Sequence, residues 1–305
     1  MKNIAIIGSG CVGSVLAKHL TENVPACTTY LIAKGKRAHR LKTEGVTVNG
    51  ETYFFPVLKE PGVPLDLLFV CVKNYDMDTA CEDFRELIRP ETIILPLLNS
   101  VSPTPTLRER FPKNRVLYGF IQKLDAYREN GAFFYHIAGD IHFGYENNKT
   151  IRPELAAIRE ILEQAGFQAS IDPDMLHAVW KKWMLNVGAN QVSALTEANY
   201  LQFAAIPEIE EILRLAMQEL VTIACYEKVD LGTKDILETL HYLTTFPYPK
   251  QTSMLQDVLA HRRTEVDYIS GDIIRLSRKW NCPCPVNLAM YYLIKSKEKA
   301  YLSES

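Results

Sequence analysis

Apolar and polar positions follow two different periods along the first half of the chain. Short apolar runs predict strands at 3–7, 28–32, 67–72, 92–97 and 116–120, with further β-like runs at 133–137 and 140–144. Apolar residues at helical spacing predict helices at 12–22, 36–43, 76–88, 104–110 and 152–165, followed by a short strand at 167–171. Such alternation is typical of an α/β fold, a doubly wound parallel sheet with helices on both faces.

The pattern changes after Asp172-Pro173-Asp174, where an acidic residue can cap a helix and the proline suits a turn. Helical periodicity then predicts helices at 175–195, 207–228, 233–244, 252–279 and 285–299, with no clear strand among them. We therefore expect two domains, an α/β domain over 1–172 and an all-α domain over 173–305.

The first predicted strand runs directly into Gly8-Ser9-Gly10-Cys11-Val12-Gly13 and then into a helix. In a dinucleotide-binding loop the first glycine permits the tight turn and the second lets the backbone approach a pyrophosphate. The third lets the helix pack on the strand. The helix N-terminus offers N–H groups and a positive dipole end to the anion. We interpret Gly8, Ser9, Gly10, Cys11, Val12 and Gly13 as the cofactor-binding loop of a Rossmann-type domain.

The residue that follows the second predicted strand indicates which dinucleotide binds. An NAD site usually has an acid here for the ribose 2′-OH, but Ala33 and Lys34 follow Ile32 and a basic run continues to Lys42. A cation suits a 2′-phosphate, so the pattern favours NADP with Lys34 as its ligand. The alternative is that this basic run is a solvated helix face.

Polar residues follow two further predicted strands. Lys73 comes after the apolar run 67–72, and Asn99 comes after the apolar run that ends at Leu98. Ligands bind beyond the carboxyl ends of the strands in such sheets, so both are candidates for cofactor contact. The alternative is that each residue only begins a loop.

The helix predicted at 175–195 carries a polar line on an otherwise apolar surface. Lys182, Asn186 and Asn190 are four residues apart and share one face, while most of their neighbours are apolar. Polar side chains on a largely buried helix need partners or a ligand. The alternative is that Lys182 is solvated and the two amides are surface positions.

Overall charge and cysteine content restrict the partners. The chain has 305 residues and a formal net charge of −2, which argues against a surface for nucleic acid. No apolar run reaches membrane-spanning length, no signal segment is evident, and the seven cysteines are scattered. We expect a cytoplasmic protein with no membrane partner. Cys282-Pro283-Cys284 lacks a second pair at ligand spacing, so we expect no metal.

A second polar cluster lies between Thr252 and Asp267. Thr252 or Ser253 is a candidate helix cap, and Arg262, Arg263 and Asp267 are candidates for helix ion pairs. The order of residues here, together with the motifs above, resembles the ketopantoate reductase (2-dehydropantoate 2-reductase) family over nearly the whole chain. The resemblance rests on Gly8–Gly13, Val72-Lys73, Leu98-Asn99, Lys182/Asn186/Asn190, Ser253-Met254-Leu255-Gln256-Asp257, Arg263-Thr264-Glu265-Val266-Asp267-Tyr268-Ile269, Gly271 and Cys284-Pro285-Val286-Asn287.

The resemblance implies a Rossmann domain, an α-helical C-terminal domain and reduction of 2-dehydropantoate to (R)-pantoate by NADPH in pantothenate and coenzyme A synthesis. It implies that Lys182 is the proton donor, and that Asn186, Asn190 and Ser253 bind a small 2-oxo acid substrate together with Lys182. Lys73, Asn99 and Glu265 match the nicotinamide side, with Glu265 in contact with the cofactor. We expect Lys73, Asn99, Lys182, Asn186, Asn190, Ser253 and Glu265 to line one groove between the domains. Burial should lower the pKa of Lys182, and Glu265 should restrain that fall.

Two departures from the family pattern leave the keto acid open. Ser100 stands where the family usually has a glycine, and the serine would be strained if the position requires a positive φ. The segment 119–131 does not match the family's nicotinamide loop. One alternative function is reduction of another 2-oxo acid or imine by an opine or β-hydroxyacid dehydrogenase. Another is a non-enzymatic NADP-binding regulator. Oligomeric state also stays open, with a homodimer as one alternative.

Overall fold

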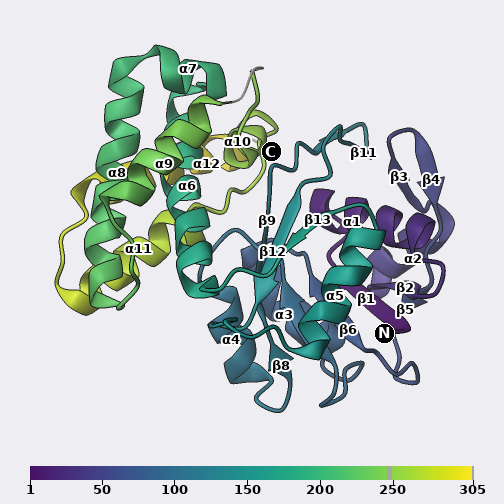
Figure 1. Cartoon of the computed structure of the whole chain (residues 1–305). Helices are drawn as coiled ribbons and strands as arrows, with labels where there is room; N and C mark the ends of the chain where they lie inside the picture. The colour runs from purple at the N-terminus through teal and green to yellow at the C-terminus, as the bar shows by residue number, and fades with distance from the viewer. Residues whose placement is uncertain (246–248, 304–305) are drawn as a thin grey trace. The chain divides into compact units, whose positions relative to one another are not determined.

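The computed structural model describes residues 1–245 and 249–303 (Figure 1). The chain divides into two compact units. The first comprises Met1–Leu98 and Pro103–Leu176, and the second comprises Asn99–Ser102 and His177–Ser305. The first unit contains all the described strands and the second contains helices, which confirms the predicted Rossmann-type sheet and the helical C-terminal region.

The main sheet of the first unit has six strands, and every adjacent pair is parallel. In spatial order they are β5 (Val57–Leu58), β2 (Thr28–Ile32), β1 (Asn3–Ile7), β6 (Leu67–Val70), β7 (Ile93–Pro96) and β8 (Arg115–Val116). The first strand of the chain, β1, is central. From β1 the chain adds β2 and β5 on one side and then crosses to add β6, β7 and β8 on the other side. This is the topology that places a ligand at the carboxyl ends of β1 and its neighbours.

Helices cover both faces of this sheet because β1 is apolar on both sides. Ile4 and Ile6 belong to one core cluster, and Ala5 and Ile7 belong to another. The first cluster includes residues of α1 (Cys11–Asn23), α2 (Gly35–Thr43) and α5 (Pro153–Gln164). The second includes residues of α3 (Met77–Phe84) and α4 (Pro103–Arg110), and a short 3₁₀ turn, η1 (Asn74–Asp76), precedes α3.

Two smaller sheets complete the first unit. One has the order β10 (Tyr127–Glu129), β11 (Ala132–Phe134), β3 (Val46–Val48), β4 (Glu51–Tyr53). The other has the order β13 (Gln168–Ser170), β12 (Asp140–Gly144), β9 (Tyr118–Gln122). The prediction of one strand over 116–120 is wrong, because β8 pairs with β7 whereas β9 pairs with β12. Val116 and Leu117 are both buried but in different clusters, so hydrophobicity does not mark the break.

The second unit consists of helices packed around α6, and its described part contains no strand (Figure 1). The helices are α6 (Met175–Thr196), α7 (Tyr200–Ala205), α8 (Pro207–Tyr226), α9 (Thr233–Thr244), α10 (Ser253–Leu259), α11 (Val266–Trp280) and α12 (Pro285–Ser303). The prediction of one helix over 252–279 is wrong. The chain leaves the helix after α10, His261 takes a left-handed φ of 52°, and the Thr264 N–H donates to Glu298 Oε1 at 2.6 Å.

A buried polar network fixes the centre of this helical unit. Gln191 Nε2 on α6 donates to Asn287 Oδ1 at 2.8 Å, and the Ser270 hydroxyl on α11 donates to Gln191 Oε1. Asn287 Nδ2 donates in turn to Glu219 Oε2 on α8 at 2.8 Å. The closing Pro285-Val286-Asn287 segment therefore serves a structural network that joins four helices.

Candidate active site

The glycine loop follows β1 and has the geometry that its glycines predict. Gly8 has a φ of +100°, and a Cβ there would lie 2.5 Å from the carbonyl carbon of Cys71. A Cβ on Gly13 would lie 1.9 Å from the Gly8 oxygen, so only glycine lets α1 begin this close to β1. A Cβ on Gly10 would meet nothing within 4 Å. Gly10 also caps α1 without a side-chain bond, so this side of the loop has room for an anion at the helix N-terminus.

Lys34 and Lys73 follow β2 and β6, the two strands that flank β1, and β1 leads into the glycine loop. Lys34 comes after β2 and precedes α2; its ammonium lies 3.3 Å from the Glu82 carbonyl oxygen and 3.6 Å from Asp83 Oδ1. The side chain is 45% exposed, so it can exchange this carboxylate for another anion. Lys73 is half-buried after β6, and the backbone of Cys71 just before it lies against Gly8.

In the polar line predicted on α6, the two amides are buried and Lys182 is half-buried. Asn186 is 3% exposed, and its Oδ1 accepts a hydrogen bond from Lys182 Nζ at 3.3 Å. Its Nδ2 is also buried and has no hydrogen-bond partner among the described residues. An unsatisfied buried amide costs free energy, and here it is next to a lysine ammonium. An ammonium and an unpaired amide N–H are the kinds of donor that an oxygen-rich ligand accepts from.

One turn further along α6, Asn190 meets the start of α10. Asn190 Oδ1 accepts from the Ser253 hydroxyl and from the Met254 N–H, both at 3.4 Å. The cap of α10 is Thr252, whose hydroxyl accepts from the Leu255 N–H at 3.2 Å. Of the two candidate caps, the structure selects Thr252, so the Ser253 hydroxyl has no capping role and lies beside Asn190.

The pKa of Lys182 is lowered to about 8. Burial of the ammonium is the main cause, and the positive charge of Lys250 adds to it. The expectation that Glu265 restrains this fall is wrong. The charge that acts on Lys182 is the cation Lys250, and it lowers the pKa further. A lysine whose pKa lies near neutral pH is a far better proton donor than a solvated one.

Glu265 instead belongs with Asn99. Glu265 is 5% exposed, and its Oε2 accepts from Asn99 Nδ2 at 3.5 Å. Ser100 does not take a positive φ, so the serine brings no backbone strain. Its hydroxyl bonds the Ser102 hydroxyl at 2.9 Å, and Ser102 bonds Asp272 on α11. These bonds connect the loop 99–102 to α11, the helix whose N-cap is Glu265.

Several candidates have purely local roles, and two relevant residues were missed. Arg262 pairs with Asp257 at 2.9 Å and Arg263 with Asp267 at 3.4 Å, but both arginines lie in the turn between α10 and α11, so the expectation of ion pairs within one helix is wrong. Lys250 and Asp272 were not among the predicted site residues. The position of Lys250, three residues before Ser253, was the only sequence signal that could have found it.

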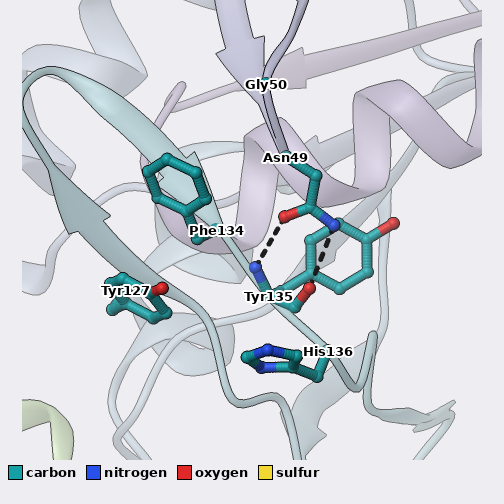
Figure 2. A pocket seen from close by; sticks show the side chains of 6 residues that line it. All are labelled: Asn49, Gly50, Tyr127, Phe134, Tyr135 and His136. Carbon is teal, nitrogen blue, oxygen red and sulfur yellow. Dashed lines mark hydrogen bonds between the residues drawn. The ribbon is translucent and has the colours of Figure 1, made fainter.

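Other features of the described residues carry no such chemistry. A surface pocket beside β11 is lined by Asn49, Gly50, Tyr127, Phe134, Tyr135 and His136, none of them a predicted site residue (Figure 2). Within residues 1–245 and 249–303, no group of three or more His, Cys, Asp and Glu side chains could hold a metal ion. None of the seven cysteines forms a disulfide. None of the described helices is both long and apolar enough to cross a membrane.

A parallel nucleotide-binding sheet, a tight glycine loop and a buried lysine on a helical unit define a class of two-part oxidoreductases. Comparison with known families narrows the class. The family model "Ketopantoate reductase PanE/ApbA" matches residues 4–148, and the model of its C-terminal part matches residues 174–298. The chain belongs to the ketopantoate reductase family, a family of oxidoreductases.

Individual relatives agree with this assignment. The 2-dehydropantoate 2-reductase of Pyrococcus horikoshii is 26% identical over 97% of both chains. Among solved structures, the PanE/ApbA family ketopantoate reductase of Ralstonia eutropha has a TM-score of 0.84 at 23% identity, covering 98% of this chain and 99% of that one. D-mandelate dehydrogenase with NADH and anilino(oxo)acetate has a TM-score of 0.86 at 22% identity, with the same coverage. At these identities the two structural likenesses concern the fold.

Proposed function

We propose that this protein reduces 2-dehydropantoate to (R)-pantoate with NADPH, and that Lys182 is the proton donor. The observation that supports this most is the pair formed by Lys182 and Asn186. It combines an ammonium of lowered pKa with a buried amide N–H for which residues 1–245 and 249–303 offer no acceptor. Membership of the ketopantoate reductase family and the name of the Pyrococcus horikoshii relative support the choice of substrate.

The reduced nicotinamide would supply the hydride, and the glycine loop fits the group that carries it. Gly10 leaves open space at the N-terminus of α1, where a pyrophosphate would accept N–H bonds. Lys34 would exchange Asp83 for the 2′-phosphate, which is the basis for proposing NADPH over NADH. We assign Gly8–Gly13, Lys34, Lys73, Asn99 and Glu265 to cofactor binding.

Lys182 would donate a hydrogen bond to the ketone oxygen of the substrate. Negative charge develops on this oxygen during reduction, so the ammonium stabilises the transition state more than the ground state, and it then gives up its proton. Asn186 Nδ2 would donate to the same end of the substrate. Asn190 and Ser253 would hold its remaining polar groups and fix its orientation toward the cofactor.

A reductase of another 2-oxo acid is the second candidate. The observation that favours it is the close fold likeness to a D-mandelate dehydrogenase that was solved with anilino(oxo)acetate, a carboxylate whose neighbouring carbonyl belongs to an amide and has the same arrangement of oxygens as a 2-oxo acid. We retain 1–172 and 173–305 as the proposed cofactor and substrate domains. We propose a cytoplasmic location, and a homodimer stays an open alternative.

A substrate panel tests the proposal. The purified protein is assayed with 2-dehydropantoate, 3-methyl-2-oxobutanoate and phenylglyoxylate, each with NADPH and with NADH, and consumption of the reduced cofactor is followed by absorbance. We expect the highest kcat/KM for 2-dehydropantoate with NADPH. Preference for phenylglyoxylate would support the second candidate, and no turnover of any 2-oxo acid with either cofactor would reject both.

A further inference from the structure

Lys250 lies in a short stretch before α10 that is tied to neighbouring helices. Its carbonyl oxygen accepts from the Tyr200 N–H at 3.0 Å, where α7 begins. Its ammonium lies 6.0 Å from the centroid of the Tyr200 ring, within cation–π range. Two residues later, the Thr252 hydroxyl donates to Ser193 Oγ on α6 at 3.0 Å. The backbone of Lys250 is therefore held beside the helix that carries the polar line.

Lys250 comes three residues before Ser253, whose hydroxyl bonds Asn190 of the polar line at 3.4 Å, and the positive charge of Lys250 acts on Lys182. The other members of the polar line and its partner on α10, namely Asn186, Asn190 and Ser253, are neutral. Two cations beside neutral hydrogen-bonding groups make a site for an anion, because bringing a negative group between them removes the repulsion and adds two attractions.

We propose that Lys250 binds the carboxylate of the 2-oxo acid and thereby leaves Lys182 for the ketone oxygen. The inference rests on the proposed function, since it takes a 2-oxo acid as the substrate. In such an acid the carboxylate is bonded directly to the ketone carbon, so both groups must be bound at one end of the molecule. Neutral amides alone would bury a carboxylate without a counter-charge, which is costly. A second lysine supplies that charge and frees the transferable proton of Lys182 for the ketone.

Binding of the carboxylate by Lys250 would also change the protonation of Lys182. When the carboxylate neutralises Lys250, the repulsion that lowers the pKa of Lys182 disappears and the pKa rises. Lys182 is then held in its charged form when the substrate is bound. We expect the alkaline limb of kcat, which reports the enzyme–substrate complex, at a higher pH than the alkaline limb of kcat/KM, which reports the free enzyme.

The test compares Lys250→Met, Lys250→Gln and Lys250→Arg with wild type, using 2-dehydropantoate and its neutral lactone as substrates. Lys234→Met is the matched control, because it removes a lysine charge from an exposed position on α9 of the same unit. Loss of one charged hydrogen bond should raise KM for the acid about 10- to 100-fold, with kcat within a few-fold, in the Met and Gln variants. Lys250→Arg should keep most of the affinity, and Lys234→Met should match wild type.

Two further readouts separate this role from general damage to the fold. KM for the lactone should be nearly unchanged in all variants, because it has no carboxylate. The kcat/KM limb should move to higher pH in Lys250→Met, where one source of repulsion on Lys182 is gone. Unchanged KM for the acid in both Met and Gln variants would overturn the inference while leaving the proposed function intact. Wild type that reduces no 2-oxo acid would instead reject the proposed function, and this inference with it.

Discussion

Lys182 joins two properties that rarely occur together, a charged side chain and a place on a helix that is buried along most of its length. Burial and the charge of Lys250 both lower its pKa, to about 8. Below that pH the ammonium is present and can donate, and above it the donor is lost.

The first prediction therefore concerns pH. We expect kcat/KM for 2-dehydropantoate to be constant near pH 7 and to fall as pH rises through about 8, because the free enzyme loses the Lys182 proton there. Steady-state kinetics from acid to alkaline pH measure this limb. A kcat/KM that stays flat well above pH 9 would show that Lys182 is not the titrating donor.

The pKa shifts of Lys182 and its neighbour Lys181 have opposite signs, so replacing the two lysines should change the free energy of unfolding in opposite directions. The pKa of Lys182 is below its ordinary value of 10.5, so the folded state binds fewer protons than the unfolded state between about pH 8 and 10.5. The free energy of unfolding should therefore rise as pH increases across that window. At pH values below the window, the buried charge of Lys182 destabilises the folded state. Lys182→Met should therefore be more stable than wild type at pH 7, and this gain should shrink toward pH 10.5.

Lys181 is the matched control for this prediction. Burial lowers its pKa, but bonds to Glu238 and Asp235 outweigh burial and raise it. Its contribution to stability is present below the unfolded pKa and is lost as pH rises through the folded pKa, so Lys181→Met should destabilise the protein at pH 7. Urea unfolding at pH 7 and near pH 10 measures both variants. Equal loss of stability in the two variants at pH 7 would contradict the account.

Cofactor choice is also a prediction about one residue. Lys34 makes a partly exposed ion pair with Asp83 and a bond to the Glu82 carbonyl oxygen, so a 2′-phosphate can replace Asp83 at little cost. Lys34→Ala should weaken NADPH binding about tenfold and leave NADH binding nearly unchanged, since the lost partner is the phosphate. Lys36→Ala, at an exposed position two residues on, is the control. A fluorescence titration that finds wild type preferring NADH would refute the assignment.

At the scale of elements, the glycine loop makes separable predictions for fold and for cofactor. Gly13→Ala places a methyl group on the Gly8 oxygen and should lower the melting temperature or prevent folding. Gly10→Ala points its methyl group into open space and should leave the melting temperature near wild type. It should nevertheless weaken NADPH binding, because the methyl group occupies the approach of the pyrophosphate. Wild-type NADPH affinity in Gly10→Ala would mean that the cofactor does not bind at this loop.

The sequence predicts elements best where periodicity and burial agree. The strands at 3–7, 28–32 and 140–144 and the helix at 233–244 match the structure at both ends. Prediction fails where a continuous apolar run changes sheets, as at Leu117, or where a tertiary contact ends a helix. The turn between α10 and α11 depends on Glu298, which is distant in sequence. The short strands β3, β4, β5 and β10 and helix α7 were missed, since they are too short for a periodic signal.

For the candidate site, residue spacing along the chain predicts which side chains share a face of one helix. It does not predict which residues of other elements pack beside that face. The face shared by Lys182, Asn186 and Asn190 follows from helical geometry, and residue type limits the α10 cap to Thr252 or Ser253, of which the structure selects Thr252. The influence of Lys250 on Lys182 depends on how α7 and α10 pack against α6, which no local pattern encodes. For the same reason Glu265 was assigned an influence on Lys182 that it does not have.

At the scale of the whole molecule, the proposed site residues are divided between two units. The first carries the glycine loop, Lys34 and Lys73, and the second carries Lys182 and its neighbours together with the loop 99–102. The proposed reaction needs both sets of residues around one substrate, which stays a prediction. The division implies that a change in the second unit can abolish turnover while cofactor binding in the first unit survives.

Substitution of Lys182 tests that implication and the central claim together. NADPH affinity and turnover of 2-dehydropantoate are measured on the same purified Lys182→Ala protein, by fluorescence titration and by steady-state kinetics. We predict that turnover falls by about 10²- to 10³-fold, the usual loss for one electrostatic donor to a developing oxyanion, while NADPH affinity stays within a few-fold of wild type. Lys182→Arg should recover only part of the rate, because guanidinium keeps the charge but is a poor proton donor. Near-wild-type turnover in Lys182→Ala would contradict the account, since the proton would then come from another group.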